Sequence, residues 1–200
     1  AGIEIDTDAI DYDLRMRQGG YGRGGRQKIE TDKVELLTGV WKNVSMGSPV
    51  TLQVINRDYK LEKLKELERP RPGHGDLTGA VKFLGSIRNV LERSSARETA
   101  VRVAAGALAK QILAEFQIEC IGFVDELGGQ QIHRQEGDIQ KWRTLREQSE
   151  VYSLNPAQDP EIKQLIDQAE EQGDTLGGIL EVHIAGLPFG LGTHAQWDRK

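Results

Sequence analysis

Apolar side chains recur along this chain at two spacings, one typical of helices and one typical of strands. A first helix is predicted to follow Asp6 or Thr7, either of which can cap it, and to end before the Gly19-Gly20 pair. Ile10, Leu14 and Met16 are predicted to form its broadly apolar face. Further helices are predicted at residues 95–116, 139–150 and 161–171, the last ending at Gly173, with a turn or two more at 61–68.

Short runs rich in Val, Leu and Ile predict the strands. Residues 34–40 and 49–55 are two such runs, and the Gly47-Ser48 between them predicts a short connection that joins them as a hairpin. Two further strands are predicted at residues 118–127 and 179–185. Since helices and strands mix without a regular βαβ order, the pattern favours an α+β fold over a doubly wound sheet.

The predicted helix at residues 95–116 begins with a capping-box pattern, in which Ser95 is followed three residues later by Glu98. The first backbone N–H groups of a helix have no partner within it, so Ser94, Ser95 and Ala96 form a natural site for a phosphate group. The alternative is that Ser95 only caps the helix. Arg97 beside the cap favours binding.

Basic residues are concentrated in one part of the chain. The whole chain has 26 Lys and Arg against 31 Asp and Glu. Residues 69–110 reverse this balance, with Arg69, Arg71, Lys82, Arg88, Arg93, Arg97, Arg102 and Lys110 against Asp76, Glu92 and Glu98. Most of these cations are arginines, whose planar guanidinium binds phosphate or carboxylate through two hydrogen bonds. The segment therefore indicates a site for a multiply charged anion rather than only a solvated surface.

His74 is the candidate catalytic residue of this segment. It lies in the sequence R-P-G-H-G-D, where Gly73 and Gly75 leave the imidazole unshielded by neighbouring side chains. A histidine both takes and gives a proton near neutral pH. An ordinary loop histidine is the alternative interpretation.

Length and composition exclude several classes of protein. With 200 residues the chain suits one domain or an incomplete part of a larger one. Cys120 is the single cysteine, and no Cys/His spacing resembles a zinc site, so neither a disulfide nor a bound metal is expected. The apolar runs are too short to span a bilayer, and nothing resembles a signal peptide, so a cytoplasmic protein with no membrane partner is expected.

A glycine-rich loop, QGGYGRGGR, follows the first predicted helix at residues 18–26. Arg/Gly segments with aromatic residues also bind single-stranded nucleic acid. This segment occurs once, in a chain of net charge −5, so no nucleic acid partner is expected.

Five ordered blocks of the sequence resemble the chorismate synthase family across the whole chain. They are RQGGYGRGGR (17–26), GSPV (47–50), RPGHGDLTGA (71–80), RNVLERSSARETAVRVAAGALAK (88–110) and GLPFGLGTHAQWDRK (186–200). The resemblance implies a carbon–oxygen lyase of the shikimate pathway, which leads to the aromatic amino acids. This enzyme would convert 5-enolpyruvylshikimate 3-phosphate into chorismate and phosphate by a 1,4-anti elimination that requires reduced FMN. A homotetramer is also implied, with a β-α-β sandwich in which helices lie between antiparallel sheets.

The same resemblance assigns roles to individual residues. The residues it implies for substrate binding are Arg17, Arg23, Arg26, Arg71 and Arg97. Arg17 and Arg23 also match positions assigned to NADP, which is relevant where a family member uses NADPH to reduce its own flavin. Ser94, Ser95 and Ala96 match the FMN-binding segment. His74 matches one of two essential histidines, thought to protonate the reduced flavin.

The sequence departs from the family pattern in three places. The other essential histidine belongs to a Gly-Glu-Ser-His-Gly motif upstream of Ala1, and the family continues beyond Lys200. Residues 82–88 are one residue shorter than the usual spacing and lack its common Gly-His pair. The expectation is therefore that residues 1–200 form a single partial chorismate synthase domain. A catalytically inactive fragment that serves as an anion-binding or oligomerisation module is the alternative.

Overall fold

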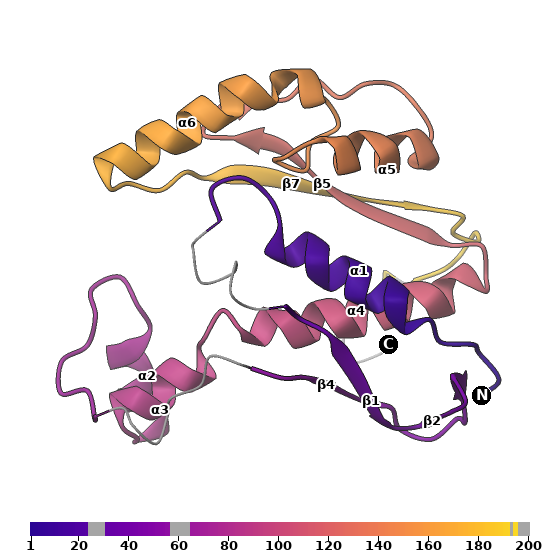
Figure 1. Ribbon diagram of the computed structural model, residues 1–200, viewed down its shortest axis with the longest axis horizontal. Helices are drawn as coiled ribbons and strands as arrows, with labels where there is room; N and C mark the ends of the chain where they lie inside the picture. The colour runs from indigo at the N-terminus through magenta and orange to yellow at the C-terminus, as the bar shows by residue number, and fades with distance from the viewer. Residues whose placement is uncertain (24–30, 57–64, 193, 196–200) are drawn as a thin grey trace. The chain divides into compact units, whose positions relative to one another are not determined.

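The computed structural model describes residues 1–23, 31–56, 65–192 and 194–195. Its contacts divide the chain into a first unit of Ala1–Arg17 and Lys28–Ala107 and a second unit of Gln18–Gln27 and Leu108–Lys200. Both units combine helices with antiparallel strands, and Figure 1 labels most of these elements. The α+β class predicted from the sequence is confirmed.

The first unit opens with helix α1 (Thr7–Gln18). Its cap is Asp6, because Oδ1 of Asp6 accepts hydrogen bonds from the backbone N–H groups of Asp8 and Ala9 at 2.8 and 3.2 Å. The predicted apolar face is confirmed for Ile10 and Leu14, which are both fully buried, whereas Met16 is only partly buried. The end of α1 at Gln18 also agrees with the sequence.

Four short strands follow α1. Strand β1 (Val34–Thr38) pairs antiparallel with β4 (Thr51–Val54), which confirms the predicted pairing. The predicted short connection is wrong, because β2 (Val40–Trp41) and β3 (Val44–Ser45) form a second hairpin between them. Its turn residues Lys42 and Asn43 both have positive φ angles, 48° and 64°, as a two-residue hairpin turn requires.

Two helices precede the long helix of this unit, α2 (Asp76–Phe83) and α3 (Ile87–Arg93), and the sequence pattern did not predict them. They pack closely through Gly79, where an added Cβ would lie 2.3 Å from a methyl group of Val90. The helical turns expected at residues 61–68 fall partly outside the described residues, and residues 65–68 are not helical.

Helix α4 (Glu98–Ala114) is the longest helix that the structure describes, and it crosses the boundary between the two units. It begins three residues later than predicted and ends two residues earlier. Ala100, Ala104 and Ala107 form its buried face. These small side chains leave room for neighbouring elements to approach the helix.

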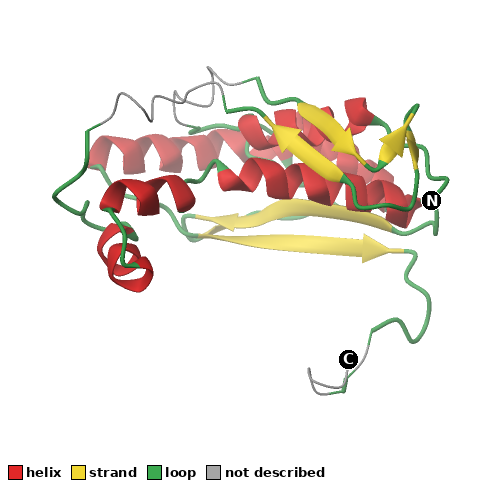
Figure 2. Ribbon diagram, turned by 90° about the horizontal axis from the view of Figure 1, so that it is seen from below, coloured by secondary structure: helices red, strands yellow, loops and turns green. Residues whose placement is uncertain are grey.

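The second unit is built on strands β5 (Glu119–Leu127), β6 (Gln130–Gln131) and β7 (Gly178–Ala185). The order is β6-β5-β7 and both pairings are antiparallel. Figure 2 shows the two long strands β5 and β7 side by side, running in opposite directions. The strands predicted at residues 118–127 and 179–185 are confirmed.

Helices α5 (Ile139–Gln148) and α6 (Asp159–Gln172), with the short helix η3 (Pro156–Gln158), complete this unit on one side of the strands (Figure 1). Asp138 caps α5. Gly173 ends α6 with a φ of 66°, as the sequence predicted. The core residues of the unit are Ile121, Phe123, Ile132, Val151, Leu154 and Ile162. Within the described residues, no helix has both the length and the apolar character needed to cross a membrane.

Candidate anion-binding site

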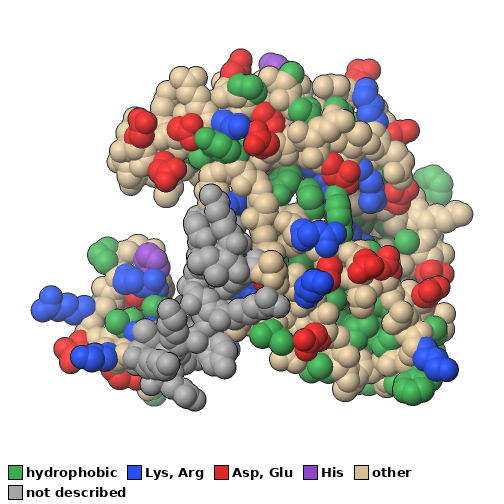
Figure 3. Space-filling view, viewed as in Figure 1, with side chains coloured by type: hydrophobic (Ala, Val, Ile, Leu, Met, Phe, Trp, Pro, Cys, Tyr) green, Lys and Arg blue, Asp and Glu red, His purple; other side chains and the backbone are tan. Residues whose placement is uncertain are grey.

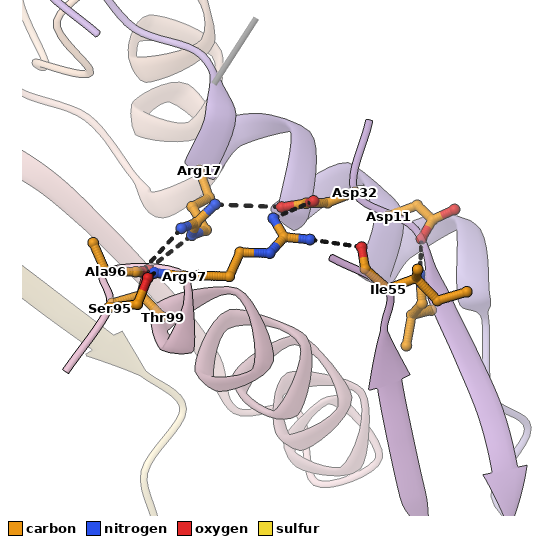
Figure 4. Close-up of polar contacts among 9 residues, drawn as sticks. Asp11, Arg17, Asp32, Ile55, Ser95, Ala96, Arg97 and Thr99 are labelled. Carbon is orange, nitrogen blue, oxygen red and sulfur yellow. Dashed lines mark hydrogen bonds and ion pairs between the residues drawn. The ribbon is translucent and has the colours of Figure 1, made fainter. Parts of the chain in front are cut away.

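Two of the candidate arginines meet at one buried carboxylate. Nη1 of Arg97 lies 2.5 Å from Oδ1 of Asp32, and Nη1 of Arg17 lies 3.3 Å from Oδ2 of the same side chain (Figure 4). The side chain of Asp32 is only 1% exposed, whereas those of Arg17 and Arg97 are 12% and 15% exposed. The fold therefore brings together two cations that are 80 positions apart in the sequence.

Further hydrogen bonds fix both guanidinium groups. Arg17 donates from Nε to Oγ1 of Thr99 at 2.9 Å and from Nη2 to the carbonyl of Ala96 at 3.2 Å. Arg97 donates from Nη2 to the carbonyl of Ile55 at 2.9 Å. The end of α1, the end of β4 and the start of α4 are thus joined through these two side chains.

The capping box predicted at the start of α4 does not form. The carboxylate of Glu98 instead pairs with Arg102, one turn further along the helix, at 2.8 Å. The hydroxyl of Ser95 accepts from the backbone N–H of Arg97 at 3.2 Å. The capping-box prediction is wrong because the Glu98 carboxylate forms its ion pair with Arg102, four residues later on the same helix face. It therefore does not bond back to the start of the helix.

The phosphate site predicted at this helix start has fewer backbone N–H groups left for a ligand than the sequence suggested. The N–H groups of Glu98 and Thr99 already donate to the carbonyls of Ser95 and Ala96, at 3.1 Å each. Within the described residues, the N–H groups of Ser95 and Ala96 themselves have no acceptor. Two backbone donors therefore stand beside the arginine pair, at positions that the sequence had singled out.

Two pockets adjoin this helix start. One of about 200 Å³ is lined by Val54, Asn56, Arg93, Ser95, Arg97, Glu98, Ala100 and Val101. A second of about 320 Å³ lies between α2 and α3 and is lined by Gly75, Thr78, Gly79, Lys82, Phe83, Val90, Arg93 and Ser94. Arg93 lines both pockets, so the two pockets share one cationic side chain.

Arg71 is held by a second buried carboxylate. Its Nε and Nη2 donate to the two oxygens of Asp76 at 2.9 and 3.0 Å, and its backbone N–H donates to Asp76 at 3.0 Å. The Asp76 side chain is 1% exposed. These hydrogen bonds from Arg71 lower the pKa of Asp76 to about 2, so the pair is fully charged at neutral pH.

His74 lies in the turn between Arg71 and α2. Its Nδ1 is 2.9 Å from the carbonyl of Pro72. Because a carbonyl only accepts, this hydrogen bond requires the proton on Nδ1, which leaves the lone pair of the neutral ring on Nε2. Figure 3 shows Lys and Arg side chains and a histidine gathered on the surface over α2 and α3.

The remaining candidates belong to the glycine-rich loop. Arg23 donates from Nε to the carbonyl of Gly19 at 3.1 Å and lies in the second unit. Arg26 lies outside the described residues. Arg17, Arg71, His74, Ser94, Ser95, Ala96 and Arg97 all lie in the first unit.

Tyr21 ties the glycine-rich loop to the second unit. Its backbone N–H donates to the carbonyl of Glu150 at 2.7 Å, and its hydroxyl donates to Asp167 at 2.7 Å. The hydrogen bond to Asp167 raises the pKa of Tyr21. Nζ of Lys163 lies 4.5 Å from the centre of the tyrosine ring. The loop is therefore anchored two residues before Arg23.

Sequence reasoning missed Asp32 and Asp76, the two carboxylates that hold the arginines. Asp76 lies in the R-P-G-H-G-D segment, two residues from His74. An acidic residue so close to several arginines could have indicated an ion pair. Asp32 has no such signal, because it lies 15 positions from Arg17 and 65 positions from Arg97. Only the fold shows that it contacts both.

Comparison with known proteins gives one consistent result. The sequence profile of the family described as chorismate synthase matches residues 1–200. Proteins named chorismate synthase from Geobacter sulfurreducens and Geotalea daltonii are 47% and 48% identical over 214 and 213 aligned residues. A protein of the same name from Streptococcus thermophilus is 45% identical over 216 residues.

A solved structure shares the fold. It is described as a crystal structure of chorismate synthase and superimposes with a TM-score of 0.79 at 36% sequence identity. The match covers 100% of this chain and 55% of that one. All of this chain is likewise covered by the three relatives, of which it covers 54%, 54% and 56%. The chain therefore spans about half the length of the curated relatives it matches.

Proposed function

Because the chain belongs to the chorismate synthase family, we propose that it takes part in the conversion of 5-enolpyruvylshikimate 3-phosphate into chorismate and phosphate, a 1,4-anti elimination of the shikimate pathway. The observation that carries the proposal is the pair of arginines held on Asp32 beside the N–H groups of Ser95 and Ala96. In this proposal residues 1–200 are one partial chorismate synthase domain.

The chemistry of the substrate matches the cations of the first unit. The substrate has a phosphate and two carboxylates, and each of these groups accepts two hydrogen bonds from one guanidinium. Arg17, Arg71 and Arg97 are proposed to bind these groups, and the resemblance to the family adds Arg23 and Arg26 as substrate-binding candidates. In such a site, fixed cations stabilise the negative charge that develops on the leaving phosphate better than mobile water does.

The start of α4 also fits the phosphate of FMN. The N–H groups of Ser95 and Ala96 are donors without an acceptor among the described residues, and Arg93 lines the pocket on either side of them. Ser94, Ser95 and Ala96 are therefore proposed to hold reduced FMN. When bound, reduced FMN would lend an electron to the substrate as phosphate leaves and recover it afterwards.

His74 is proposed to supply the proton that the reduced flavin needs. The carbonyl of Pro72 keeps the Nδ1 proton in place, so Nε2 is the atom that would bind and release the transferred proton. In family members that reduce their own flavin, NADPH would use Arg17 and Arg23. We also propose that the protein is a cytoplasmic homotetramer, as its family membership implies.

Turnover tests this function directly. The purified protein, with its intact mass recorded, is mixed under anaerobic conditions with reduced FMN and 5-enolpyruvylshikimate 3-phosphate, and chorismate is followed by its absorbance. Formation of chorismate and phosphate in equal amounts is expected. Binding of the substrate without any chorismate would instead support an anion-binding module. No binding and no turnover by the folded protein would refute the proposal.

A further inference from the structure

The side chain of Asp32 contacts both Arg17 and Arg97. Each of its oxygens serves a different guanidinium, at 3.3 Å for Arg17 and 2.5 Å for Arg97. With only 1% of its side chain exposed, Asp32 has almost no access to water. Its charge is therefore compensated by the two arginines.

The charge balance of these three side chains explains why the arrangement is useful. Two guanidinium groups that are mostly buried repel each other strongly, because the interior screens charge poorly. One carboxylate between them offsets most of that repulsion and leaves the group with a formal charge of +1. The two cations can thus stay together when no anionic ligand is bound. The net positive charge of the three side chains still attracts an anion.

Further hydrogen bonds of the two arginines also depend on how their guanidinium groups are oriented. Arg17 reaches Thr99 and the carbonyl of Ala96, while Arg97 reaches the carbonyl of Ile55 (Figure 4). These acceptors are neutral, and each receives one N–H from the two guanidinium groups. Asp32 supplies the charged contact that both side chains share.

We propose that Asp32 is a positioning residue that sets the distance and orientation of the Arg17 and Arg97 guanidinium groups for the anionic substrate. The inference rests on the proposed function for the identity of that substrate. Asp32 acts through the two arginines and does not touch the substrate itself. An anion enters a pair of cations already fixed in place, so little side-chain entropy is lost on binding.

The sign of one charge change separates positioning from simple electrostatics. Asp32→Asn removes a negative charge beside an anion site, so electrostatics alone predicts tighter binding of the substrate. Positioning predicts the opposite, because each carboxylate oxygen of Asp32 serves a different guanidinium, and the amide would replace one of these acceptors with an NH2 group that only donates. We expect the Kd for 5-enolpyruvylshikimate 3-phosphate to rise about tenfold or more. We also expect kcat to fall as KM rises, because the same guanidinium groups are proposed to stabilise the charge on the leaving phosphate.

Asp11→Asn is the matched control. Asp11 is also a buried carboxylate of the first unit, and its Oδ1 accepts from the backbone N–H of Val34 at 2.9 Å. This substitution removes the same charge and is expected to leave the Kd within about twofold. Tighter or unchanged binding in Asp32→Asn, or equal weakening in both variants, would overturn the inference.

Two further measurements keep the test independent of folding and of the proposed function. If Asp32→Asn does not fold, Thr99→Val is the second variant, because it removes the exposed acceptor of Arg17 Nε. We expect it to raise the Kd by a smaller factor than Asp32→Asn would. An unchanged Kd would count against positioning. If the wild type binds no substrate, the proposed function fails, but arginine Nε–H resonances still report on orientation. Slow exchange of the Arg17 Nε–H with solvent in the wild type, lost in Asp32→Asn, supports the inference, and equal exchange in both contradicts it.

Discussion

Arg71 and Asp76 form a two-point ion pair in which Nε and Nη2 of the guanidinium lie 2.9 and 3.0 Å from the two carboxylate oxygens. These bonds lower the pKa of Asp76 from 3.8 to about 2. A carboxyl whose pKa is lower in the folded state stabilises the fold above its unfolded pKa and loses that contribution as the pH falls through its folded pKa. Asp76 therefore stabilises the fold above about pH 4 and ceases to do so between about pH 4 and pH 2.

Asp76→Asn tests this pH dependence. The variant is expected to unfold at a lower temperature than the wild type at pH 7, and the difference should shrink as the pH falls from about 4 to about 2. Thermal unfolding followed by circular dichroism over this range measures it. Asp8→Asn, which changes an exposed carboxylate in the first turn of α1, serves as the control. A difference between the Asp76 variant and the wild type that stayed constant from pH 7 to pH 2 would be inconsistent with the ion pair.

Gly79→Ala is expected to destabilise the packing of α2 on α3. The added methyl group would lie 2.3 Å from Cγ1 of Val90, so the two helices must move apart. Overpacking of this kind costs about 1–3 kcal/mol. Denaturant unfolding gives the change in the free energy of unfolding.

Gly106→Ala is the matched helical control. Gly106 lies within α4, and an added Cβ would meet nothing within 4 Å. Its substitution should stabilise the protein by about 0.5–1 kcal/mol, because alanine has the higher helix propensity. If both alanine variants shifted stability in the same direction, the contact between Gly79 and Val90 would not be the cause.

Tyr21→Phe is expected to loosen the anchor of the glycine-rich loop. The substitution removes the hydrogen bond from the Tyr21 hydroxyl to Asp167 and keeps the ring beside Lys163. Faster hydrogen exchange of the residue 21 amide, which donates to the carbonyl of Glu150, is the measurement. Asp167→Asn should have a similar effect, and the double variant should add little to either. Fully additive effects would show that the two side chains act separately.

Much of the fold follows from local patterns. The cap at Asp6, the end of α6 at Gly173 and the long strands β5 and β7 each depend on a few neighbouring residues, and the structure confirms them. The hairpin of β2 and β3 was missed because each strand has only two residues and the turn is Lys42-Asn43 rather than a glycine-containing pair.

The candidate site residues were predicted from the arginine-rich segment, the helix start and the family resemblance, but the geometry that holds them was not predicted. A run of arginines is visible in the sequence, and Ser95 and Ala96 are visible as a helix start. The pairing of Arg17 with Arg97 is set by Asp32, a contact across 65 positions that no periodicity marks. The failed capping box has a similar cause, since the competing Arg102 lies outside the four-residue pattern.

The binding free energy of 5-enolpyruvylshikimate 3-phosphate to the wild type and to Arg97→Ala, measured by calorimetry with reduced FMN present, tests the central claim most directly. Arg102→Ala is the control, because Arg102 is an exposed arginine one turn away that pairs with Glu98. The account predicts saturable binding by the wild type and a loss of at least ~1.5 kcal/mol in Arg97→Ala, with little change in Arg102→Ala. Equal affinity of the wild type and Arg97→Ala would remove Arg97 from the site and contradict the account.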